Sequence, residues 1–422
     1  MPHPFLGIGF TSPLFSKFFR EETEELLELT TKSDTTSYQI NVTSSGSTWT
    51  YKVDWGDGNI ENFTESNTGS SRPSHTYSSA GVYEIKFTPT GSTTTLFFNT
   101  QSGERSKITM VDGVGSSEWT SFGTAGNLFT SHVNITSISS SLDTSNCAIW
   151  YGAFYLNDSL TPFPLLDTSS ATNIEYALLG CTSLTSFPLI DTSNVTTMKQ
   201  TWQGCINLTS FPPIDTSSVV NTGGDGTSTG FYFTWYNCTG LTSFPVIDTS
   251  NATQLPGTWD TCSGLTSFPV IDTSNVTNMQ QTWQNCSGLT SFPILNYTNV
   301  TSFLFAWRNC SSLTSFTGAF GAGLIRFGSA WNGCTALADF SANAFDNVDA
   351  DNTHHFYLSF TNCPNLTPQS IENILVSIDT SGASNSIISL NGTTPAESTW
   401  TSAALTAKTN LVSRGWTVQS TA

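Results

Sequence analysis

Apolar residues return at a fixed spacing of 24 positions through the middle of the chain. The clearest sign is a column of cysteines, each 24 residues from the next: Cys238, Cys262, Cys286, Cys310 and Cys334. Cys181 and Cys205 are also 24 apart, whereas the steps to Cys238 and from Cys334 to Cys363 are longer by nine and five residues. A fixed period of this length is typical of stacked repeats and lies in the leucine-rich-repeat range.

Within one repeat, the order of apolar and polar residues predicts small elements. Leu265–Pro269 and Val276–Met279 each predict one short strand, and Asp272–Asn275 predicts the turn between them. Trp283 and Cys286 are three residues apart, which favours a single helical turn facing inward. Because one repeat cannot bury these side chains alone, we predict a solenoid in which neighbouring coils share a core.

Between Tyr38 and Phe98 the apolar period becomes two, as in half-buried strands. Between these strands lie Asp54-Trp-Gly-Asp57-Gly and a second motif, His75-Thr-Tyr-x-x-x-Gly-x-Tyr83. Together the two motifs resemble the polycystic-kidney-disease (PKD) type of immunoglobulin-like sandwich, which implies a spacer or adhesion module. Asp54 and Asp57 are expected to be turn residues, with a cation or ligand role as the alternative.

The repeats also resemble a known family. The Cys-x-x-Leu-Thr-Ser-Phe core, with an aromatic residue three positions before the Cys, resembles BspA-type leucine-rich repeats. The Asp-Thr-Ser-Asn-Val-Thr-x-Met segment is similar to related repeats of bacterial surface lipoproteins and bacteriophage appendage proteins. This resemblance implies a surface-exposed, ligand-binding arm.

The two ends of the repeat region differ from its middle. Lys107–Val111 and Trp119–Phe122 are expected to form degenerate first coils. After the last Cys, the sequence predicts a helix starting at Thr367 and Pro368, then a strand, a second helix and a final short strand. We therefore predict a mainly β chain of four parts: a docking segment (1–32), a PKD-like β-sandwich (33–98), a leucine-rich-repeat solenoid (99–366) and an α/β cap (367–422).

The first part is apolar and then acidic. Residues 1–12 are an apolar peptide broken by prolines and glycines, and the segment from Pro13 to Leu29 predicts one amphipathic helix with Pro13 near its start. We expect this segment to dock onto another subunit, and the alternative is a strap packed over the protein's own body. The apolar docking residues are Phe5, Leu6, Ile8, Phe10, Phe15, Phe18 and Phe19.

Charge and hydropathy narrow the classes of partner. Only 10% of the residues are charged and the formal net charge is −18, so there is no basic surface to meet nucleic acid. The chain has no apolar run long enough for a transmembrane helix, and its first residues do not form a secretory signal. A surface-type protein without such a signal can reach the outside by assembly on a virion and release by lysis.

Three columns of the repeat carry chemical groups. The cysteines are expected to be buried, reduced thiols, with disulfides between neighbouring coils as the alternative. The tryptophans that precede them by three residues are expected in the core, with an exposed sugar-stacking stripe as the alternative. An acidic column is expected to form Asx-type turns, with Ca²⁺ bound between stacked carboxylates as the alternative, and comprises Asp143, Asp167, Asp191, Asp215, Asp248 and Asp272.

Places that interrupt the repeat are the best candidates for binding, since loops on a rigid scaffold usually carry function. The first insert, Gly223–Gly230, contains Asp225 and lies beside Tyr232 and Tyr236, whose rings can stack on a sugar. The second insert lies around Asn347–His355. We expect the three residues Asp225, Tyr232 and Tyr236 to bind ligand.

No catalytic triad, phosphate-binding loop, dinucleotide fingerprint or metal motif is present in the sequence. We therefore expect a non-enzymatic virion structural or adhesion protein, such as a bacteriophage tail-fibre or surface-appendage subunit. It would dock to other virion proteins, form a homo-oligomer (a trimer), and bind a glycan or protein of the host surface. The alternatives are a bacterial cell-surface leucine-rich-repeat adhesin and a glycan-cleaving fibre, for which a carboxylate pair would be needed.

Overall fold

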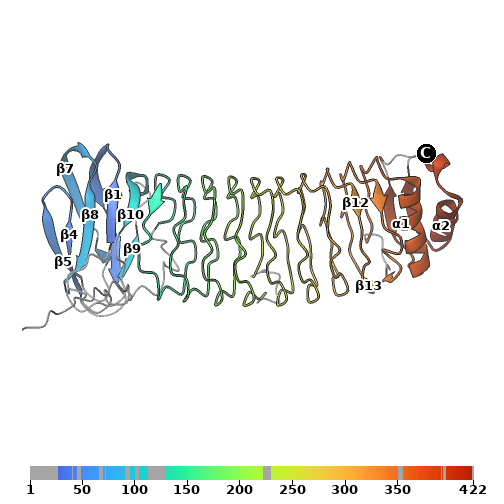
Figure 1. Cartoon of the computed structure of the whole chain (residues 1–422), viewed down its shortest axis with the longest axis horizontal. Coiled ribbons are helices and arrows are strands. Elements are labelled where there is room, and N and C mark those ends of the chain that lie inside the picture. Colours follow the sequence, from blue (N-terminus) through green and yellow to red (C-terminus); the bar gives the residue numbers. More distant parts are fainter. Residues whose placement is uncertain are drawn as a thin grey trace, which may run out of the picture.

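The chain is a long stack of repeats with a β-rich part at one end and two helices at the other (Figure 1). It is mainly β, with few helices. The computed structural model describes residues 27–39, 41–44, 49–65, 70–71, 73–90, 96–99, 104–112, 129–221, 230–349, 355–390, 392 and 396–420.

The β-rich part is built on one six-stranded sheet, whose order is β11-β10-β1-β8-β4-β5. Alternate residues of its strands, such as Tyr51, Val53, Ile85 and Phe87, are buried, as the period of two predicts. Smaller sheets pair β2 with β7, and β3 with β6 and β9. The strands are β1 (Leu27–Thr31), β2 (Thr35–Gln39), β3 (Asn41–Ser44), β4 (Trp49–Asp54), β5 (Ile60–Glu65), β6 (Ser70–Ser71), β7 (Ser74–Gly81), β8 (Glu84–Pro89), β9 (Leu96–Asn99) and β10 (Ile108–Asp112).

The predicted helix from Pro13 to Leu29 is wrong at its described end, because β1 is a strand. Leu27 and Leu29 are buried on one face of the sheet, and Glu28 on the other side forms an ion pair of 3.4 Å with Lys86. Antiparallel pairing with β8 and with β10 outweighs the helical preference of this leucine- and glutamate-rich segment. The apolar docking residues, Phe5 to Phe19, lie outside the described residues, and docking remains a prediction.

Strand β10 joins the sheet to the repeats. It pairs antiparallel with β1 on one side and parallel with β11 (Ser137–Ile138) of the first coil on the other. The segment Lys107–Val111, expected to be a degenerate first coil, thus completes the N-terminal sheet and also stacks in parallel on the first coil, as a capping coil does. Trp119–Phe122 lies outside the described residues.

Each 24-residue repeat forms one coil, and alternate backbone N–H groups bond to the next coil. In the coil of Trp259, Leu255, Gly257, Trp259 and Thr261 donate to the carbonyls of Asn278, Gln280, Thr282 and Gln284, at 2.7–3.0 Å. The intervening N–H groups bond within the coil, as that of Cys262 does to the Trp259 carbonyl at 3.2 Å. Both sets together satisfy the buried backbone of this segment.

The predicted helical turn before each Cys is a β-turn instead. The residue just before the Cys has a φ of 58–79° throughout, which is the left-handed region. A β-turn with positive φ at its third residue favours Gly or Asn there. The positions are Gly180, Gly204, Asn237, Thr261, Asn285, Asn309, Gly333 and Asn362.

The short strands predicted in every coil form only in some coils. Pro269 and Pro293 have no N–H, so the ladder breaks after the preceding Phe. Where Pro is replaced by Thr317 or Ser341, strands β12 (Ser315–Phe316) and β14 (Asp339–Phe340) pair in parallel. A second pair joins β13 (Gly323–Leu324) to β15 (Val348–Asp349).

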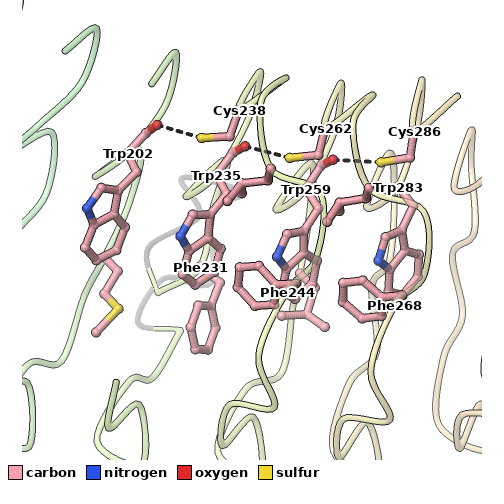
Figure 2. Packing of buried hydrophobic residues seen from close by; sticks show 14 of the residues in the cluster. Trp202, Phe231, Trp235, Cys238, Phe244, Trp259, Cys262, Phe268, Trp283 and Cys286 are labelled. Carbon is pink, nitrogen blue, oxygen red and sulfur yellow. Dashed lines mark hydrogen bonds between the residues drawn. The ribbon is translucent and has the colours of Figure 1, made fainter. Parts of the chain in front are cut away.

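The core is a ladder of stacked indoles beside a ladder of thiols (Figure 2). Successive indoles from Trp202 to Trp331 are nearly parallel, with centroids 5.3–6.0 Å apart. Each thiol from Cys238 to Cys363 donates to the carbonyl of the Trp in the preceding coil, at 3.0–3.2 Å. All nine cysteines are free and buried, and burial raises the pKa of Cys181 to about 12. The predictions of a buried Trp column and of buried thiols are confirmed, and the reduced state of the thiols stays a prediction.

The C-terminal elements follow the predicted order. Thr367 caps α1 (Pro368–Ser381) by accepting the Ser370 N–H at 3.2 Å, and β16 (Ile387–Leu390) comes next. The 3₁₀ turn η3 (Glu397–Thr399) precedes α2 (Ser402–Ser413), and β17 (Thr417–Ser420) pairs in parallel with β16. A further turn, η2 (Arg105–Lys107), precedes β10. Neither helix has the length and hydropathy needed to cross a membrane, and no other helix occurs among the described residues.

Candidate functional site

The coils are nearly identical on most of their circumference and differ on one face. The Leu-Thr-Ser-Phe-Pro and Asp-Thr-Ser columns hardly change from coil to coil. Three other positions, which lie six, five and two residues before each Cys, carry a different set of side chains in every coil. We call the surface formed by the residues six, five and two positions before the Cys the variable face. In five successive coils these residues are Lys199, Gln200 and Gln203; Tyr232, Phe233 and Tyr236; Pro256, Gly257 and Asp260; Gln280, Gln281 and Gln284; and Leu304, Phe305 and Arg308.

A hollow of about 480 Å³ opens on this face, within the size range of small-molecule sites. It includes the predicted binding residues Tyr232 and Tyr236, which the structure brings together. Asp225, the third predicted residue, lies in 222–229, outside the described residues. The lining residues are Gln200, Gln203, Tyr232, Phe233, Tyr236, Asp260, Gln281, Gln284 and Asn285.

The hollow exists because one coil has glycine, Gly257, where its neighbours have large side chains five residues before the Cys. Gly257 has a φ of 59°, and a Cβ atom there would lie 2.3 Å from the Phe233 ring. Gln200, Phe233 and Gln281 hold the same position of neighbouring coils with φ values of 50–59°, so the backbone conformation does not itself require glycine. Glycine is needed here because a side chain would collide with the Phe233 ring. The coil of Gly257 is therefore recessed between the aromatic residues of the preceding coil and the glutamines of the following one.

Aromatic packing fixes the two tyrosines. The Phe233 ring lies edge-to-face between Tyr232 and Tyr236, with centroid distances of 4.6 and 5.2 Å. The Lys199 ammonium lies 5.4 Å from the centre of the Tyr232 ring and 5.8 Å from that of Tyr176. These contacts hold the rings in place before any ligand arrives, which lowers the entropic cost of binding.

Asp260 is the one carboxylate among the described residues that line the hollow, and it is only 2% exposed. Its Oδ1 accepts hydrogen bonds from the Thr261 hydroxyl at 2.9 Å and from the Asn285 amide at 3.2 Å. Oδ2 accepts none from the described residues, yet it is not sealed from solvent. Burial raises the pKa of Asp260 to about 6, because the charged form loses water, and the hydrogen bonds from Thr261 and Asn285 offset only part of this rise.

The sequence analysis did not identify Asp260 as a site residue, although one feature of the sequence singles it out. In the column two residues before the Cys, Asp260 is the only acid, and its neighbours in successive coils are Tyr236 and Gln284. Because the neighbouring coils have polar residues at this position, the sequence does not reveal that Asp260 is buried. Its burial depends on the recess at Gly257.

The acidic column predicted to form Asx-type turns does so. The carboxylate of each of its six residues, Asp143 to Asp272, accepts the backbone N–H of the serine two positions later at 2.8–3.1 Å. The hydrogen bond from the Ser274 N–H lowers the pKa of Asp272. Asp54 and Asp57 accept the N–H groups of Gly56 and Asn59 in the same way. No three His, Cys, Asp or Glu side chains gather in a metal-binding group among the residues that the structure describes.

A second surface column, which the sequence analysis did not identify, is apolar and exposed. Leu165, Leu189, Val246, Val270 and Ile294 occupy the same position of five coils and are 58–64% exposed, and the coil between Leu189 and Val246 has Pro213 there. This column is chemically uniform along the stack, so it offers no unique place for a ligand. The variable face, by contrast, has a different set of side chains at each coil.

Comparisons with known proteins leave the family open. No family model matches the chain, and no curated protein matches it. A solved structure of a leucine-rich repeat protein from Eubacterium ventriosum ATCC 27560 is distantly similar. It has 17% sequence identity, covers 68% of this chain and 84% of its own, and has a TM-score of 0.31. At this level of similarity nothing about ligand or function transfers to this chain.

Proposed function

We propose that this chain is a non-enzymatic adhesion arm of a virion, a bacteriophage tail-fibre or surface-appendage subunit that binds the host cell surface through its variable face. One observation supports this most strongly. The columns that build the stack repeat almost unchanged, while the one face that changes carries a hollow with prearranged tyrosines and a buried carboxylate. A rigid scaffold with one diversified face suits recognition.

In this proposal, each part of the fold has a mechanical role. The N-terminal strands form a PKD-like spacer, the repeats form a BspA-type leucine-rich-repeat solenoid, and α1 and α2 form an α/β cap over its end. Residues before Leu27 attach the arm to other virion proteins and to sister chains in a homo-oligomer, which we take to be a trimer. The bacterial cell-surface adhesin remains the alternative, and it would place the protein on the cell wall rather than on a virion.

The chemistry of the hollow favours binding over glycan cleavage. Glycoside hydrolysis normally needs two carboxyl groups on opposite sides of the scissile bond, one acting as acid and the other as base or nucleophile. Asp260 is the only carboxyl group among the described lining residues. One carboxylate that accepts hydrogen bonds is sufficient for recognition.

Binding of the labelled full-length chain to a panel of bacterial cells tests the proposal. We expect saturable binding to particular cells, reduced at least roughly tenfold in a Tyr232→Ala/Tyr236→Ala double variant, because stacked aromatic side chains supply much of the contact energy. The matched control is Tyr357→Ala, which removes a 43%-exposed tyrosine from the same face outside the hollow. Equal binding by the double variant, with unchanged circular dichroism, would place recognition elsewhere.

Mass spectrometry of purified virions and of bacterial cell walls distinguishes a virion appendage from a cell-surface adhesin. Recovery of this chain in purified virions supports the appendage, whereas recovery in the cell-wall fraction of virus-free bacteria supports the cell-surface adhesin.

A further inference from the structure

We infer that the hollow of the variable face binds a neutral oligosaccharide, with Asp260 as the acceptor for sugar hydroxyl groups and Tyr232 and Tyr236 as the rings against which the sugar packs. This inference rests on the proposed adhesion function and narrows its ligand to one chemical class. It follows from the composition, the charge and the length of the hollow.

The first step concerns hydrogen-bonding capacity. Each of the five amide side chains that line the hollow both donates and accepts hydrogen bonds, and two phenols add further donors and acceptors. Sugar hydroxyl groups also donate and accept hydrogen bonds, so they can pair with these side chains in several orientations of the sugar. Some of these amides already pair with one another, as Gln200 does with Gln203, but the buried Gln284 Oε1 has no partner among the described residues. An apolar ligand would leave that oxygen unpaired, which disfavours it. The amides are those of Gln200, Gln203, Gln281, Gln284 and Asn285.

The second step concerns the sign of the charge. No lysine, arginine or histidine is among the described lining residues, and the whole chain has a formal net charge of −18. Lys199 packs over the rings of Tyr232 and Tyr176 and is not among the described residues that line the hollow. An acidic sugar would bring its carboxylate or sulfate toward Asp260 without a compensating base, so repulsion excludes it.

The third step concerns length. The lining side chains come from four successive coils, whose tryptophans Trp202, Trp235, Trp259 and Trp283 stand in a row in Figure 2. Their indole centroids are 5.6, 5.6 and 6.0 Å apart, so the hollow extends along the axis of the stack over three coil-to-coil steps. An elongated site of this kind fits a short chain of sugar units better than a single one.

The fourth step concerns Asp260 itself. Its Oδ1 is held by Thr261 and Asn285, which orients the carboxylate, while Oδ2 has no donor among the described residues. This oxygen is open to solvent in the hollow, so a ligand that enters the hollow can reach it. Two neighbouring hydroxyl groups of a sugar would donate to it and replace the water it has lost, whereas a purely structural role gives the carboxylate no such benefit.

The test uses the full-length chain on an array of immobilised neutral, sialylated and uronic-acid oligosaccharides, followed by calorimetry with the best soluble ligand. We expect binding to neutral oligosaccharides alone. Asp260→Asn should weaken it roughly tenfold or more, as loss of a charge-assisted hydrogen bond does. Asp272→Asn, in the acidic column of Asx turns, is the matched control and should bind like the wild-type chain.

A thermal-unfolding measurement on the same variants separates recognition from folding. Asp260→Asn should fold with an unchanged or higher midpoint, so that its lost binding cannot come from a damaged fold. Binding to acidic sugars, or a loss of binding equal in Asp260→Asn and Asp272→Asn, would overturn the inference. Binding to cells with no binding to any sugar on the array would also overturn it but leave the adhesion function intact, whereas failure on cells and on the array would remove both.

Discussion

At the scale of single residues, two neighbours depart from the rules that the other coils follow. Thr261 has a φ of 62° at a position where the other coils carry Gly or Asn, and a β-branched residue is strained in that region. Asp260 beside it is a buried carboxylate. Strain and buried charge tend to be retained where function requires them. Both departures lie at the hollow.

The raised pKa of Asp260 makes a prediction for stability. The folded protein binds this proton with a pKa of about 6, against 3.8 for the unperturbed group. Between these two values the folded state holds more protons than the unfolded state, so this group's contribution to stability falls as pH rises. Asp260→Asn should therefore stabilise the protein above about pH 6, by about 1–2 kcal/mol after solvent screening is allowed for.

Thermal unfolding of both proteins across this pH range measures the effect. The difference between their midpoints should be largest above about pH 6 and should disappear below about pH 3, where the carboxyl group is protonated in both states. A variant that is less stable than the wild-type chain at neutral pH would show that Asp260 stabilises the fold.

At the scale of elements, local patterns predicted some structures and tertiary pairing decided others. The Asx turns, helix α1 with its Thr367 cap, and strand β16 follow from short-range chemistry and were predictable. The strand character of Leu27–Thr31 was not, because it depends on partners more than 50 residues away. The β-turn before each Cys was predictable from the Gly and Asn column, which requires positive φ.

The candidate site was predictable in part. The broken repeat pointed to Tyr232 and Tyr236, because an insert beside aromatic residues is visible in the sequence. The burial of Asp260 was not visible, since it arises from the recess at Gly257 and from the coils on either side. That the variable face points outward was not predictable either, because the sequence does not show which positions of each turn face the core.

Helix α1 closes the last coils with side-chain hydrogen bonds, which leads to a second prediction. The Ser377 hydroxyl accepts the buried Phe345 N–H at 2.7 Å and donates to Asp346 at 2.6 Å. Ser377→Ala leaves that N–H unpaired and should destabilise the C-terminal end by about 1–3 kcal/mol. Thr380→Ala, which loses only a bond to its own helix, is the control and should change stability little.

Hydrogen exchange measured coil by coil is the suitable readout, because repeats can unfold locally. Faster exchange should appear around Phe345 in Ser377→Ala and not around Trp259. Equal exchange in both variants would contradict the role assigned to this serine.

At the scale of the whole molecule, one continuous cluster of buried apolar side chains runs from Leu27 to Trp416. The N-terminal sheet covers the first coil through β10 and β11, and α1 covers the last coils. Both ends of the stack are thus closed, which repeat proteins need to remain soluble.

The N-terminal segment gives a prediction about assembly. Because β1 lies in the middle of the sheet, a docking test must keep Leu27 and remove only residues 1–24. We expect this truncated chain to fold, to bind cells, and to sediment as a monomer that no longer enters virions. Removing residues 1–32 instead should disrupt the sheet. A truncated 25–422 chain that still forms the wild-type oligomer would contradict docking through this segment.

The most direct test of the central claim is covalent footprinting of tyrosines on the full-length chain, free and bound to the cells it recognises. Adhesion through the hollow predicts that Tyr232 and Tyr236 become protected on binding, while Tyr357, exposed on the same face outside the hollow, is labelled equally in both states. Equal labelling of Tyr232 and Tyr236 in the free and the cell-bound chain would contradict recognition at this site.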